Sequence, residues 1–380
     1  MAKAMGVAEA WPTRWNCVPL TSALVNPVTV GLFRVEGEAD LPGQSRIPWT
    51  VVLKVVRDAS LGIPELEAGY SHEPQDWNYW NREFEVYRSG FLDDLPGPLT
   101  AVRCRVLTEV AADESWLWLE ALDDARPRRR WSQDELAASV YDLGAFSAQG
   151  LERVEEIESY DWAARRWLRG WVSSSQGFGA GHATEHDGCW QHPLLRDLLP
   201  PSTRDRYRVL MLASARLINV IESFPRTVSH HDAQWSNLFR PDAGDSRTGT
   251  IAIDWSFLGS APVGQELGNH LAGNISNRAI DPYESAAHDA SASDAYLQGL
   301  RDFGWSGDDR QVLLTRAVVV ALQMSTFVAA HVSWLCDEAA GDDPEEEQSP
   351  SWPKAVAERE GITSTRRWAR GSRASTTCWI

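Results

Sequence analysis

The spacing of hydrophobic residues changes character between about residues 120 and 130. Before this point, short apolar runs rich in β-branched and aromatic residues are separated by turns that contain Gly and Pro. Such runs predict an antiparallel sheet. The predicted strands are 28–35, 50–56, 102–110 and 116–119. One helix is expected among them, opening at the proline-containing turn 73–76 and running to about residue 88.

After the change, most apolar residues recur at helical spacing. Ser132 and Glu135 form a capping-box pattern, and residues 204–224 predict a long helix that ends before Pro225. Residues 226–254 predict a loop and a hairpin instead, and helices are expected again near residues 264, 282, 309 and 320. The fold class is therefore α+β, with a mixed first unit and a mainly helical second one.

Two segments near the C-terminus have unusual compositions. Residues 317–330 form the most apolar stretch, which is too short to span a bilayer and predicts a buried helix. Residues 337–347 carry seven acidic side chains and no basic one. Because the residues that follow are polar and lack periodicity, we expect 341–380 to be an acidic stretch and a flexible tail.

The charge of the chain restricts its partners. The 380 residues include 36 basic and 53 acidic side chains, a formal net charge of -17. This excess of acid argues against nucleic acid or an anionic membrane as a partner, whereas neutral and cationic small molecules remain open. The five cysteines are widely spaced without a C-x-x-C pair, which argues against a disulfide framework. No signal peptide is visible at the start, so we expect a cytoplasmic protein. No oligomeric state is indicated.

The strongest candidate site has the form H-x-D-x-x-x-x-N, from His230 to Asn237, followed by a predicted hairpin that ends at Asp254. The hairpin would place Asn237, at the start of one strand, beside Asp254, at the end of its antiparallel partner. Two adjacent oxygen ligands suit Mg²⁺, which keeps waters and substrate phosphates as its other ligands. Asp232 would lie near a metal-bound phosphate, where a base that orients an attacking hydroxyl group belongs.

This set resembles the catalytic loop of the aminoglycoside phosphotransferase and choline kinase family, the small-molecule branch of the protein-kinase-like fold. The similar family motif that follows is an aspartate with Trp or Phe, a glycine, and an acid–Leu pair, here Asp254-Trp255, Gly259 and Glu266-Leu267. Aspartate is usual where this chain has Glu266, a departure that concerns a structural hydrogen-bonding position. The resemblance covers roughly residues 18–335.

The resemblance implies a two-lobed fold. Residues 18–122 would form an N-lobe with an antiparallel sheet that binds the nucleotide. Residues 123–340 would form a mainly helical C-lobe with the catalytic loop and the acceptor pocket. Three tryptophans of the helical insert lie where this family builds that pocket: Trp162, Trp167 and Trp171.

Lysine is rare in this chain, and its distribution is informative. Only Lys3, Lys54 and Lys354 occur, against 33 arginines. Lys54 lies inside the apolar run 51–56, where a charge points to solvent or needs a carboxylate or a phosphate to offset desolvation. The resemblance implies that this lysine contacts the α- and β-phosphates of ATP.

The resemblance also implies a glutamate on the next helix that pairs with Lys54. Projected at 100° per residue, a helix over 77–87 has Glu83 at the edge of its apolar stripe and Glu85 roughly opposite. Glu83 is therefore the better partner. The apolar stripe itself consists of Trp77, Trp80, Phe84 and Tyr87.

The nucleotide base would bind where the two units join. In this fold the linker backbone bonds the adenine edge, and by position the Glu120 carbonyl and the Leu122 amide would do so. No G-x-G-x-x-G covers the phosphates, and only Gly31 lies in the expected hairpin. No G-K-[ST] occurs, which excludes a P-loop enzyme.

Together, the motifs imply transfer of the γ-phosphoryl group of ATP, with Mg²⁺, to a hydroxyl group of a small molecule. Asp232 would be the base, and Asn237 and Asp254 would hold the metal. One alternative is a nucleotide-binding pseudokinase or scaffold. A protein kinase is disfavoured because the segment from Asp254 to residues 264–267 is too short for an activation loop.

Two further hypotheses stay open. The cluster of His182, His186, Cys189 and His192 could bind zinc, since imidazole and thiolate are its preferred ligands, although the spacing matches no known signature. The acidic run 337–347 could attract a cationic acceptor such as an aminoglycoside, although such runs are more often solvated.

Overall fold

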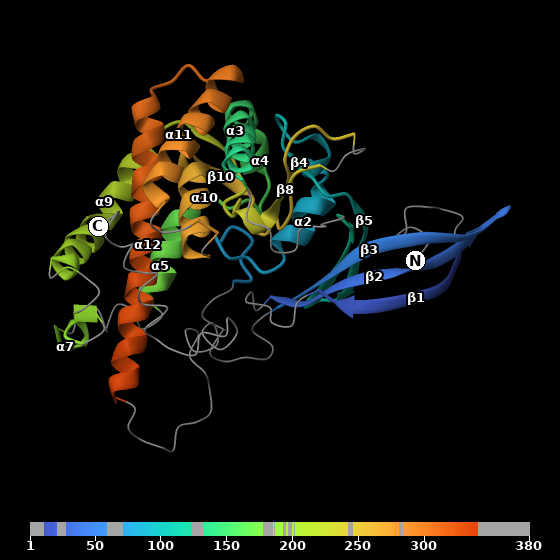
Figure 1. Cartoon of the computed structure of the whole chain (residues 1–380), viewed down its shortest axis with the longest axis horizontal. Coiled ribbons are helices and arrows are strands. Elements are labelled where there is room, and N and C mark those ends of the chain that lie inside the picture. Colours follow the sequence, from blue (N-terminus) through green and yellow to red (C-terminus); the bar gives the residue numbers. More distant parts are fainter. Residues whose placement is uncertain are drawn as a thin grey trace.

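The protein folds into two lobes, seen side by side in Figure 1. A computed structural model describes the arrangement. The described residues are 11–20, 28–58, 71–122, 132–177, 185, 187–192, 195–196, 200, 202–241, 246–277, 279–280 and 284–340. The predicted tail at 341–380 lies outside these residues, and so does most of the predicted junction at 123–131.

In the N-lobe, the described residues form a five-stranded antiparallel sheet with the order β1-β2-β3-β6-β5. This confirms the predicted sheet, although β2, β3 and β6 are longer than expected and an additional strand, β1, precedes them. The strands are β1 (Trp11–Pro19), β2 (Thr29–Leu41), β3 (Gln44–Arg57), β5 (Cys104–Ala111) and β6 (Glu114–Glu120).

One helix, α2 (Arg82–Ser89), packs against this sheet, and Trp80 and Phe84 share a buried cluster with Leu117 of β6. The helix begins at Arg82, so the prediction of a start near residue 77 was wrong. The preceding residues form turns, in which the Asp76 amide donates to the Glu73 carbonyl. Three carbonyls of this segment, those of Pro74, Asp76 and Trp77, accept hydrogen bonds from the Arg82 side chain.

The C-lobe is mainly helical, as predicted. Its capping box is present, with Ser132 Oγ accepting from the Glu135 amide and the Glu135 carboxylate accepting from the Ser132 amide. The helices are α3 (Gln133–Gly150), α4 (Val154–Ser159), α5 (Trp167–Gly177), α7 (Asp187–Trp190), α9 (Thr203–Glu222), α10 (Gln265–Ser276), α11 (Ser285–Asp302) and α12 (Asp309–Ala340).

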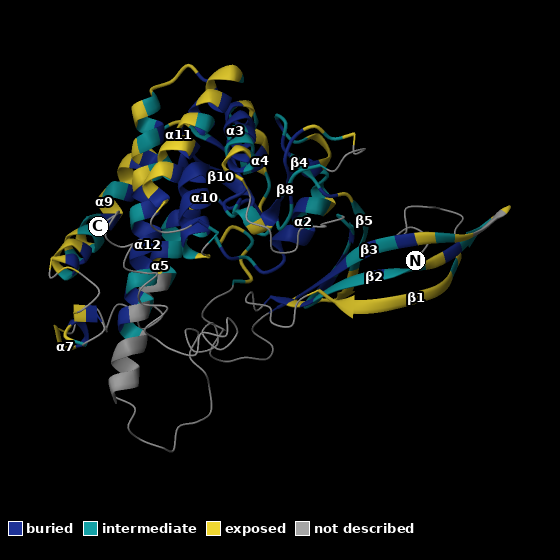
Figure 2. Cartoon of the chain, in the orientation of Figure 1, coloured by how far each residue is buried: buried dark blue, intermediate teal, exposed yellow. Residues whose placement is uncertain are grey.

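The core of the C-lobe lies around α3, α10 and α11, whose inner faces are buried (Figure 2). Trp255 and Tyr296 are its largest fully buried apolar side chains. Gly144 of α3 allows close packing, because a Cβ at this position would lie 2.2 Å from the Tyr296 carbonyl of α11.

Helix α12 crosses the C-lobe as one continuous helix of 32 residues, where the sequence suggested separate helices near 309 and 320. Among the described residues, its segment Asp309–Ala330 is long and apolar enough to cross a membrane, judged by length and composition alone. However, 61% of an 18-residue apolar stretch within this segment is buried inside the protein. It packs against α5, α9 and α10. This agrees with the predicted buried helix.

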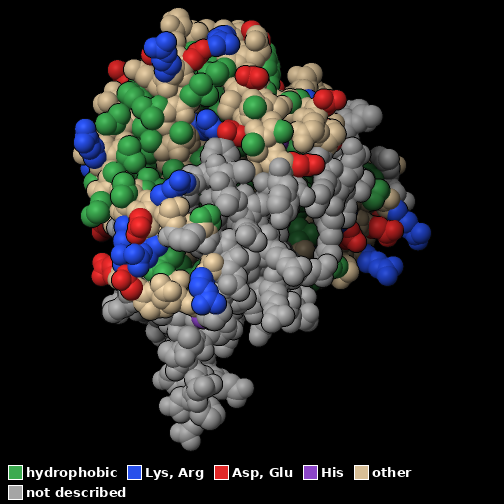
Figure 3. All heavy atoms as spheres, turned by 60° about the vertical axis from the view of Figure 1, so that its left-hand side comes forward, with side chains coloured by type: hydrophobic (Ala, Val, Ile, Leu, Met, Phe, Trp, Pro, Cys, Tyr) green, Lys and Arg blue, Asp and Glu red, His purple; other side chains and the backbone are tan. Residues whose placement is uncertain are grey.

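The outer face of the C-lobe is partly apolar. Figure 3 turns the side of α9 forward and shows apolar side chains gathered on this face, with arginine and acidic side chains between them. Val209 and Leu212 of α9 are exposed, and so is Leu314 of α12. This face lies away from the short strands that connect the two lobes.

Five short strands form two small sheets, one of which joins the two lobes. β4 (Thr100–Ala101) of the N-lobe pairs in parallel with β9 (Ile251–Ala252), which pairs antiparallel with β8 (Leu238–Phe239). β7 (Arg226–Ser229) pairs with β10 (Gly259–Pro262). The loop between β7 and β8 and the turn between β9 and β10 therefore start and end on paired strands.

Candidate active site

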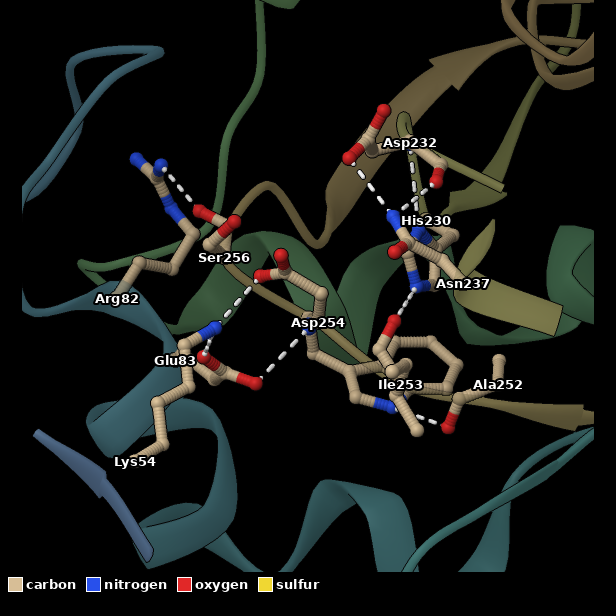
Figure 4. A network of polar contacts seen from close by, with 11 residues as sticks. Lys54, Arg82, Glu83, His230, Asp232, Asn237, Ala252, Ile253, Asp254 and Ser256 are labelled. Carbon is tan, nitrogen blue, oxygen red and sulfur yellow. Dashed lines mark hydrogen bonds and ion pairs between the residues drawn. The ribbon is translucent and has the colours of Figure 1, made fainter. Parts of the chain in front are cut away.

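The loop between β7 and β8 carries the H-x-D-x-x-x-x-N residues. Asn237 ends a short 3-10 turn and precedes β8, and its carbonyl accepts from the Ile253 amide at 2.9 Å. The β8–β9 pairing thus brings Asn237 beside the segment that contains Asp254, as the sequence predicted. The side-chain amide of Asn237 donates to Asp232 Oδ2 and to the Asp232 carbonyl, both at 2.9 Å (Figure 4).

Lys54 of β3 lies between two carboxylates. Its Nζ is 2.5 Å from Glu83 Oε2 of α2 and 2.9 Å from Asp254 Oδ1 (Figure 4). The Lys54 side chain is 8% exposed. Burial alone would lower the pKa of Lys54, but Asp254 and Glu83 together raise it, so the ammonium stays charged.

Glu83 is thus the partner of Lys54 in the structure, whereas Glu85 pairs with Arg88. Glu83 Oε1 also accepts from the Trp255 amide at 3.3 Å. Burial raises the pKa of Glu83, and Lys54 opposes that rise. One glutamate therefore connects β3, α2 and the residue that follows Asp254.

Asp232 and Asp254 have opposite electrostatic environments. Burial, and then the charge of Asp254, raises the pKa of Asp232 well above its usual range, although Asn237 opposes the rise. Burial also acts to raise the pKa of Asp254, but Lys54 outweighs it and the net pKa is lowered. Asp254 is therefore a stable carboxylate, while Asp232 has a higher affinity for a proton.

The backbone is strained at two residues of the site. His231 has a φ of 66° and Asp254 a φ of 61°, the left-handed region that non-glycine residues rarely adopt. Each such residue costs on the order of 1–3 kcal/mol and persists where surrounding contacts enforce it. His231 directly precedes Asp232, and Asp254 is itself a predicted metal ligand.

Helix α10 provides several of the hydrogen bonds that hold the backbone of the catalytic loop. Glu266 Oε2 accepts from Ser229 Oγ at 2.5 Å, from the His230 amide at 2.6 Å and from the His231 amide at 3.2 Å. This is the structural hydrogen-bonding position that the sequence indicated for Glu266. About two helical turns further on, Asn274 Oδ1 accepts from the Trp235 amide at 2.9 Å.

His230 braces the backbone of the catalytic loop. Its Nε2 lies 2.9 Å from the Ile253 carbonyl, and its Nδ1 accepts from the Asp232 amide at 3.2 Å. These partners assign the neutral tautomer with the proton on Nε2. Burial lowers the pKa of His230, which agrees with this state. Its ring also contacts Trp255 at a centroid distance of 4.5 Å.

The donor set fits a hard divalent cation. Asn237 directs its amide nitrogen at Asp232, which leaves its Oδ1 for a ligand, and Asp254 offers the carboxylate oxygen that Lys54 does not bind. The carboxylates of Asp232 and Asp254 repel each other, and a bound cation would offset that repulsion. An amide oxygen and a carboxylate oxygen are ligands of the kind that Mg²⁺ prefers, whereas zinc prefers imidazole and thiolate.

The predicted adenine-binding residues lie at the end of β6. The Glu120 side chain pairs with Arg247 at 3.2 Å and accepts from the Arg103 amide at 3.2 Å. These contacts use the side-chain carboxylate of Glu120, whereas its predicted role in binding adenine concerns the backbone carbonyl. Leu122 lies two residues beyond β6 and remains a prediction. Gly31 packs under Phe33, since a Cβ there would lie 2.3 Å from the ring.

The tryptophans of the helical insert separate into two groups. Trp162 is buried in the C-lobe core and stacks on Tyr160 at 4.8 Å, so it does not lie with the other two. Trp167 and Trp171 stack on each other at 5.3 Å, and Trp167 stacks on His231 at 5.5 Å. Trp167 therefore lies against the catalytic loop, and Trp171 lies beside Trp167.

The zinc hypothesis loses one of its ligands. Cys189 is disulfide-bonded, so it offers no thiolate to a metal. The disulfide also shows that the expectation drawn from cysteine spacing was incomplete. His182 and His186 lie outside the described residues.

Several residues of the site were missed by sequence reasoning. Arg82 and Trp77 contact the segment that follows Asp254, and His270 Nδ1 lies 2.7 Å from the Ala233 carbonyl of the catalytic loop. The only signal available in the sequence was position, since Arg82 directly precedes the predicted site residue Glu83. Such adjacency does not reveal the partners.

No protein-family model matches the sequence, and no curated protein sequence matches it either. Solved structures with a similar arrangement include a microcompartment-associated aminopropanol kinase, with 14% identity, 96% of this chain and 91% of that chain covered, and a TM-score of 0.48. A choline kinase from Cryptosporidium parvum has 12% identity, 93% coverage of each chain and a TM-score of 0.47.

An aminoglycoside phosphotransferase from Streptomyces rimosus has 16% identity, with 81% of this chain and 92% of that chain covered, and a TM-score of 0.42. These chains are remote in sequence. Their names are those of kinases for small molecules.

Proposed function

We propose that this protein is a kinase that transfers the γ-phosphoryl group of ATP to a hydroxyl group of a small molecule. One observation carries the proposal: Lys54, Glu83 and Asp254 form a continuous ion-paired set, although Lys54 and Asp254 are 200 positions apart in sequence. The same turn that carries Asp254 adjoins Asn237 and Asp232. Such a combination serves phosphoryl transfer.

Each residue has a distinct task in this proposal. Lys54 contacts the phosphates of ATP, and Glu83 fixes the position of its ammonium group. Asn237 and Asp254 hold Mg²⁺, which would neutralise charge on the phosphates when bound. Because the transition state is loose, the chain contributes mostly positioning and charge stabilisation.

Asp232 orients the acceptor hydroxyl group and takes its proton. Its raised pKa favours this role, because a base with a higher affinity for a proton is more effective near neutral pH. Asn237 holds the Asp232 carboxylate by one oxygen, Oδ2, so the other oxygen can accept from the substrate. In this proposal the acceptor oxygen attacks the γ-phosphorus while its proton moves to Asp232. The bond between the γ-phosphorus and the oxygen that bridges it to the β-phosphate breaks, and ADP leaves.

The alternatives have less support. A pseudokinase would be favoured by loss of a catalytic residue, and Lys54, Glu83, Asp232, Asn237 and Asp254 are all present. A protein kinase needs a long segment after Asp254 to bind a peptide. Here β10 begins at Gly259 and α10 begins at Gln265, so little chain is left for such a platform.

A substrate screen tests the proposal. ATP consumption is measured with Mg²⁺ over a panel of aminoglycosides, macrolides, choline-like amines, sugars and amino-acid alcohols, with generic protein substrates included. At least one small-molecule acceptor should be phosphorylated. Asp232→Ala should abolish this turnover while ATP binding, followed by calorimetry, stays nearly intact.

The matched control is Asp294→Ala, which removes an exposed aspartate of α11 and should leave turnover unchanged. Equal turnover by Asp232→Ala and the parent would refute the assignment of the base. Tight ATP binding without turnover on any acceptor would favour the scaffold, and phosphorylation of protein substrates alone would favour a protein kinase.

A further inference from the structure

Arg82, the first residue of α2, is a fully buried arginine, with a relative exposure of 0%. In the described part of the chain, its hydrogen-bond acceptors are all backbone carbonyls. None of the ion pairs formed there involves it. Its five acceptors are the carbonyls of Trp162 at 2.5 Å, Trp77 at 2.9 Å, Ser256 at 3.2 Å, Pro74 at 3.2 Å and Asp76.

A buried charge without a carboxylate is costly, so its presence needs a physical reason. Burial lowers the pKa of Arg82 to about 9, which leaves the guanidinium charged at neutral pH. A guanidinium group presents five donors in a rigid planar fork. It can therefore hold several carbonyls in a fixed arrangement, a task that a lysine with three rotatable donors performs less well.

The carbonyls that Arg82 binds belong to three segments. The first is the turn 74–77 that leads into α2, the second is the stretch of the C-lobe at Trp162, and the third is the turn at Ser256. Glu83 follows Arg82 in sequence, and Ser256 lies two residues after Asp254 (Figure 4). Arg82 thus connects the backbones that carry the two carboxylate partners of Lys54.

Trp77 makes a second connection from the same turn. Its ring stacks on Phe257 at 5.9 Å and meets the edges of Trp167 at 6.1 Å and Trp171 at 5.7 Å. Its Nε1 donates to Ser174 Oγ of α5 at 3.2 Å. The fit is tight, because a Cβ on Gly170 of α5 would lie 2.1 Å from the Trp77 ring.

We propose that Arg82 is a positioning residue of the phosphoryl-transfer site, and that with Trp77 it forms an interlobe clamp that fixes Glu83 relative to Asp254. This inference rests on the proposed function. Lys54 needs both carboxylates, so a shift of α2 against the Ser256 turn would separate them. Arg82 therefore acts on nucleotide binding through Glu83 and not by contact with the nucleotide.

The first experiment requires no nucleotide. Amide hydrogen–deuterium exchange is compared in the parent, Arg82→Lys and the control Arg153→Lys. Arg153 is a suitable control because it also binds a carbonyl, that of Asp94, while its ion-pair partner is Glu156, which is not part of the Lys54–Glu83–Asp254 set. Arg82→Lys should speed exchange about tenfold in α2 and in residues 254–257. Unchanged exchange there would overturn the clamp.

The second experiment separates positioning from general stability. Binding of Mg·ATP is measured by calorimetry in Arg82→Lys, Glu83→Gln and the double variant. Arg82→Lys should weaken binding about tenfold and lower kcat about 100-fold, a loss that small misplacements cause. The double variant should bind no more weakly than Glu83→Gln, because Arg82 acts through Glu83. Additive losses would overturn the proposal.

A third variant disturbs the clamp without touching Arg82. Gly170→Ala should displace the Trp77 ring and reproduce the faster exchange in α2. Its matched control is Gly188→Ala in α7, where a Cβ would meet no atom within 4 Å. If Gly170→Ala exchanges like the parent, the role of Trp77 is wrong. If the parent itself fails to bind Mg·ATP, the proposed function fails, and the exchange data still decide the clamp.

Discussion

The two halves of the site hold their charges by different means. On the N-lobe side, Lys54 lies between Glu83 and Asp254, and opposite charges offset the cost of burial. On the catalytic-loop side, the side-chain partners of Asp232 are the uncharged Asn237, at 2.9 Å, and Gln234, and the charges that act on it are those of the carboxylates Asp254 and Glu266. In the first half, opposite charges therefore balance one another, whereas in the second half the charge of Asp232 has no opposite charge to balance it.

This difference separates two chemical tasks. A metal ligand must remain ionised, and Lys54 lowers the pKa of Asp254. A base must accept a proton, and burial next to Asp254 raises the pKa of Asp232. Two aspartates of the same site are thus assigned to different roles by their surroundings.

The halves also differ in what positions them. The ion-paired half depends on the relative placement of β3, α2 and the turn after β9. The loop half depends on neutral and charge-assisted hydrogen bonds from α10, which hold a strained backbone. Substitutions in the two halves should therefore differ in their effects on stability as well as on activity.

The largest effect is expected for Asp254→Asn. This change removes a metal ligand and one of the two partners of Lys54, so kcat should fall about 10,000-fold. The free energy of unfolding should also fall, since the folded state favours the Asp254 carboxylate. Kinetics over a Mg²⁺ titration and thermal unfolding measure both. Activity within tenfold of the parent would contradict the metal assignment.

The second effect concerns Asp232→Asn, which should lower kcat about 1,000-fold but raise the free energy of unfolding. The folded chain binds the Asp232 proton more tightly than the unfolded chain, so ionisation above the ordinary pKa of Asp costs stability. The amide removes that cost at neutral pH. Thermal unfolding without Mg²⁺ measures it, and a less stable variant would mean that Asp232 is not electrostatically strained.

A third substitution tests the geometry of the ion-paired half. Lys54→Arg keeps the charge but replaces a compact ammonium with a planar fork in a site that is 8% exposed, so kcat should fall about 100-fold. Lys54→Met, which removes the charge, provides the comparison. Near-parental activity of Lys54→Arg would show that the charge alone matters at this position.

The pH profile distinguishes the two aspartates in the parent enzyme. Activity requires ionised Asp232, so kcat should fall about tenfold per pH unit below a pKa that lies above the usual Asp range. Asp254 should stay ionised over that range because Lys54 lowers its pKa. A profile that is flat down to the ordinary pKa of aspartate would rule out this assignment of the base.

The smallest effect on activity is expected for Glu266→Gln. The amide weakens the bonds that Glu266 Oε2 accepts from three donors of the loop, at a cost of about 2 kcal/mol in the free energy of unfolding. We expect kcat to fall only about fivefold. Glu155→Gln on the exposed face of α4 is the control. A large loss of activity without loss of stability would place Glu266 in the chemistry.

The sequence was sufficient for residues whose spacing is local. Asp232 and Asn237 are five positions apart on one loop, and the hairpin that follows brings Asp254 close by short-range pairing. Lys54 was identified because a charge inside an apolar run needs a partner, and the helical projection chose Glu83 over Glu85 although α2 starts later than expected.

The sequence was not sufficient where a partner is a backbone group or is far away in the chain. Arg82 resembles any helical arginine, and its carbonyl partners lie in segments up to 174 positions away. The disulfide of Cys189 and the separation of Trp162 from Trp167 were likewise invisible, because each depends on how distant elements pack.

The amino-acid pattern by itself therefore determined the order of sheet and helices and the identity of the chemical groups, since both follow from local periodicity and motif spacing. Only the tertiary structure decided which groups are charged, how their pKa values diverge and what holds the two halves together. These properties depend on burial and on contacts between distant segments, and the fold alone supplies both.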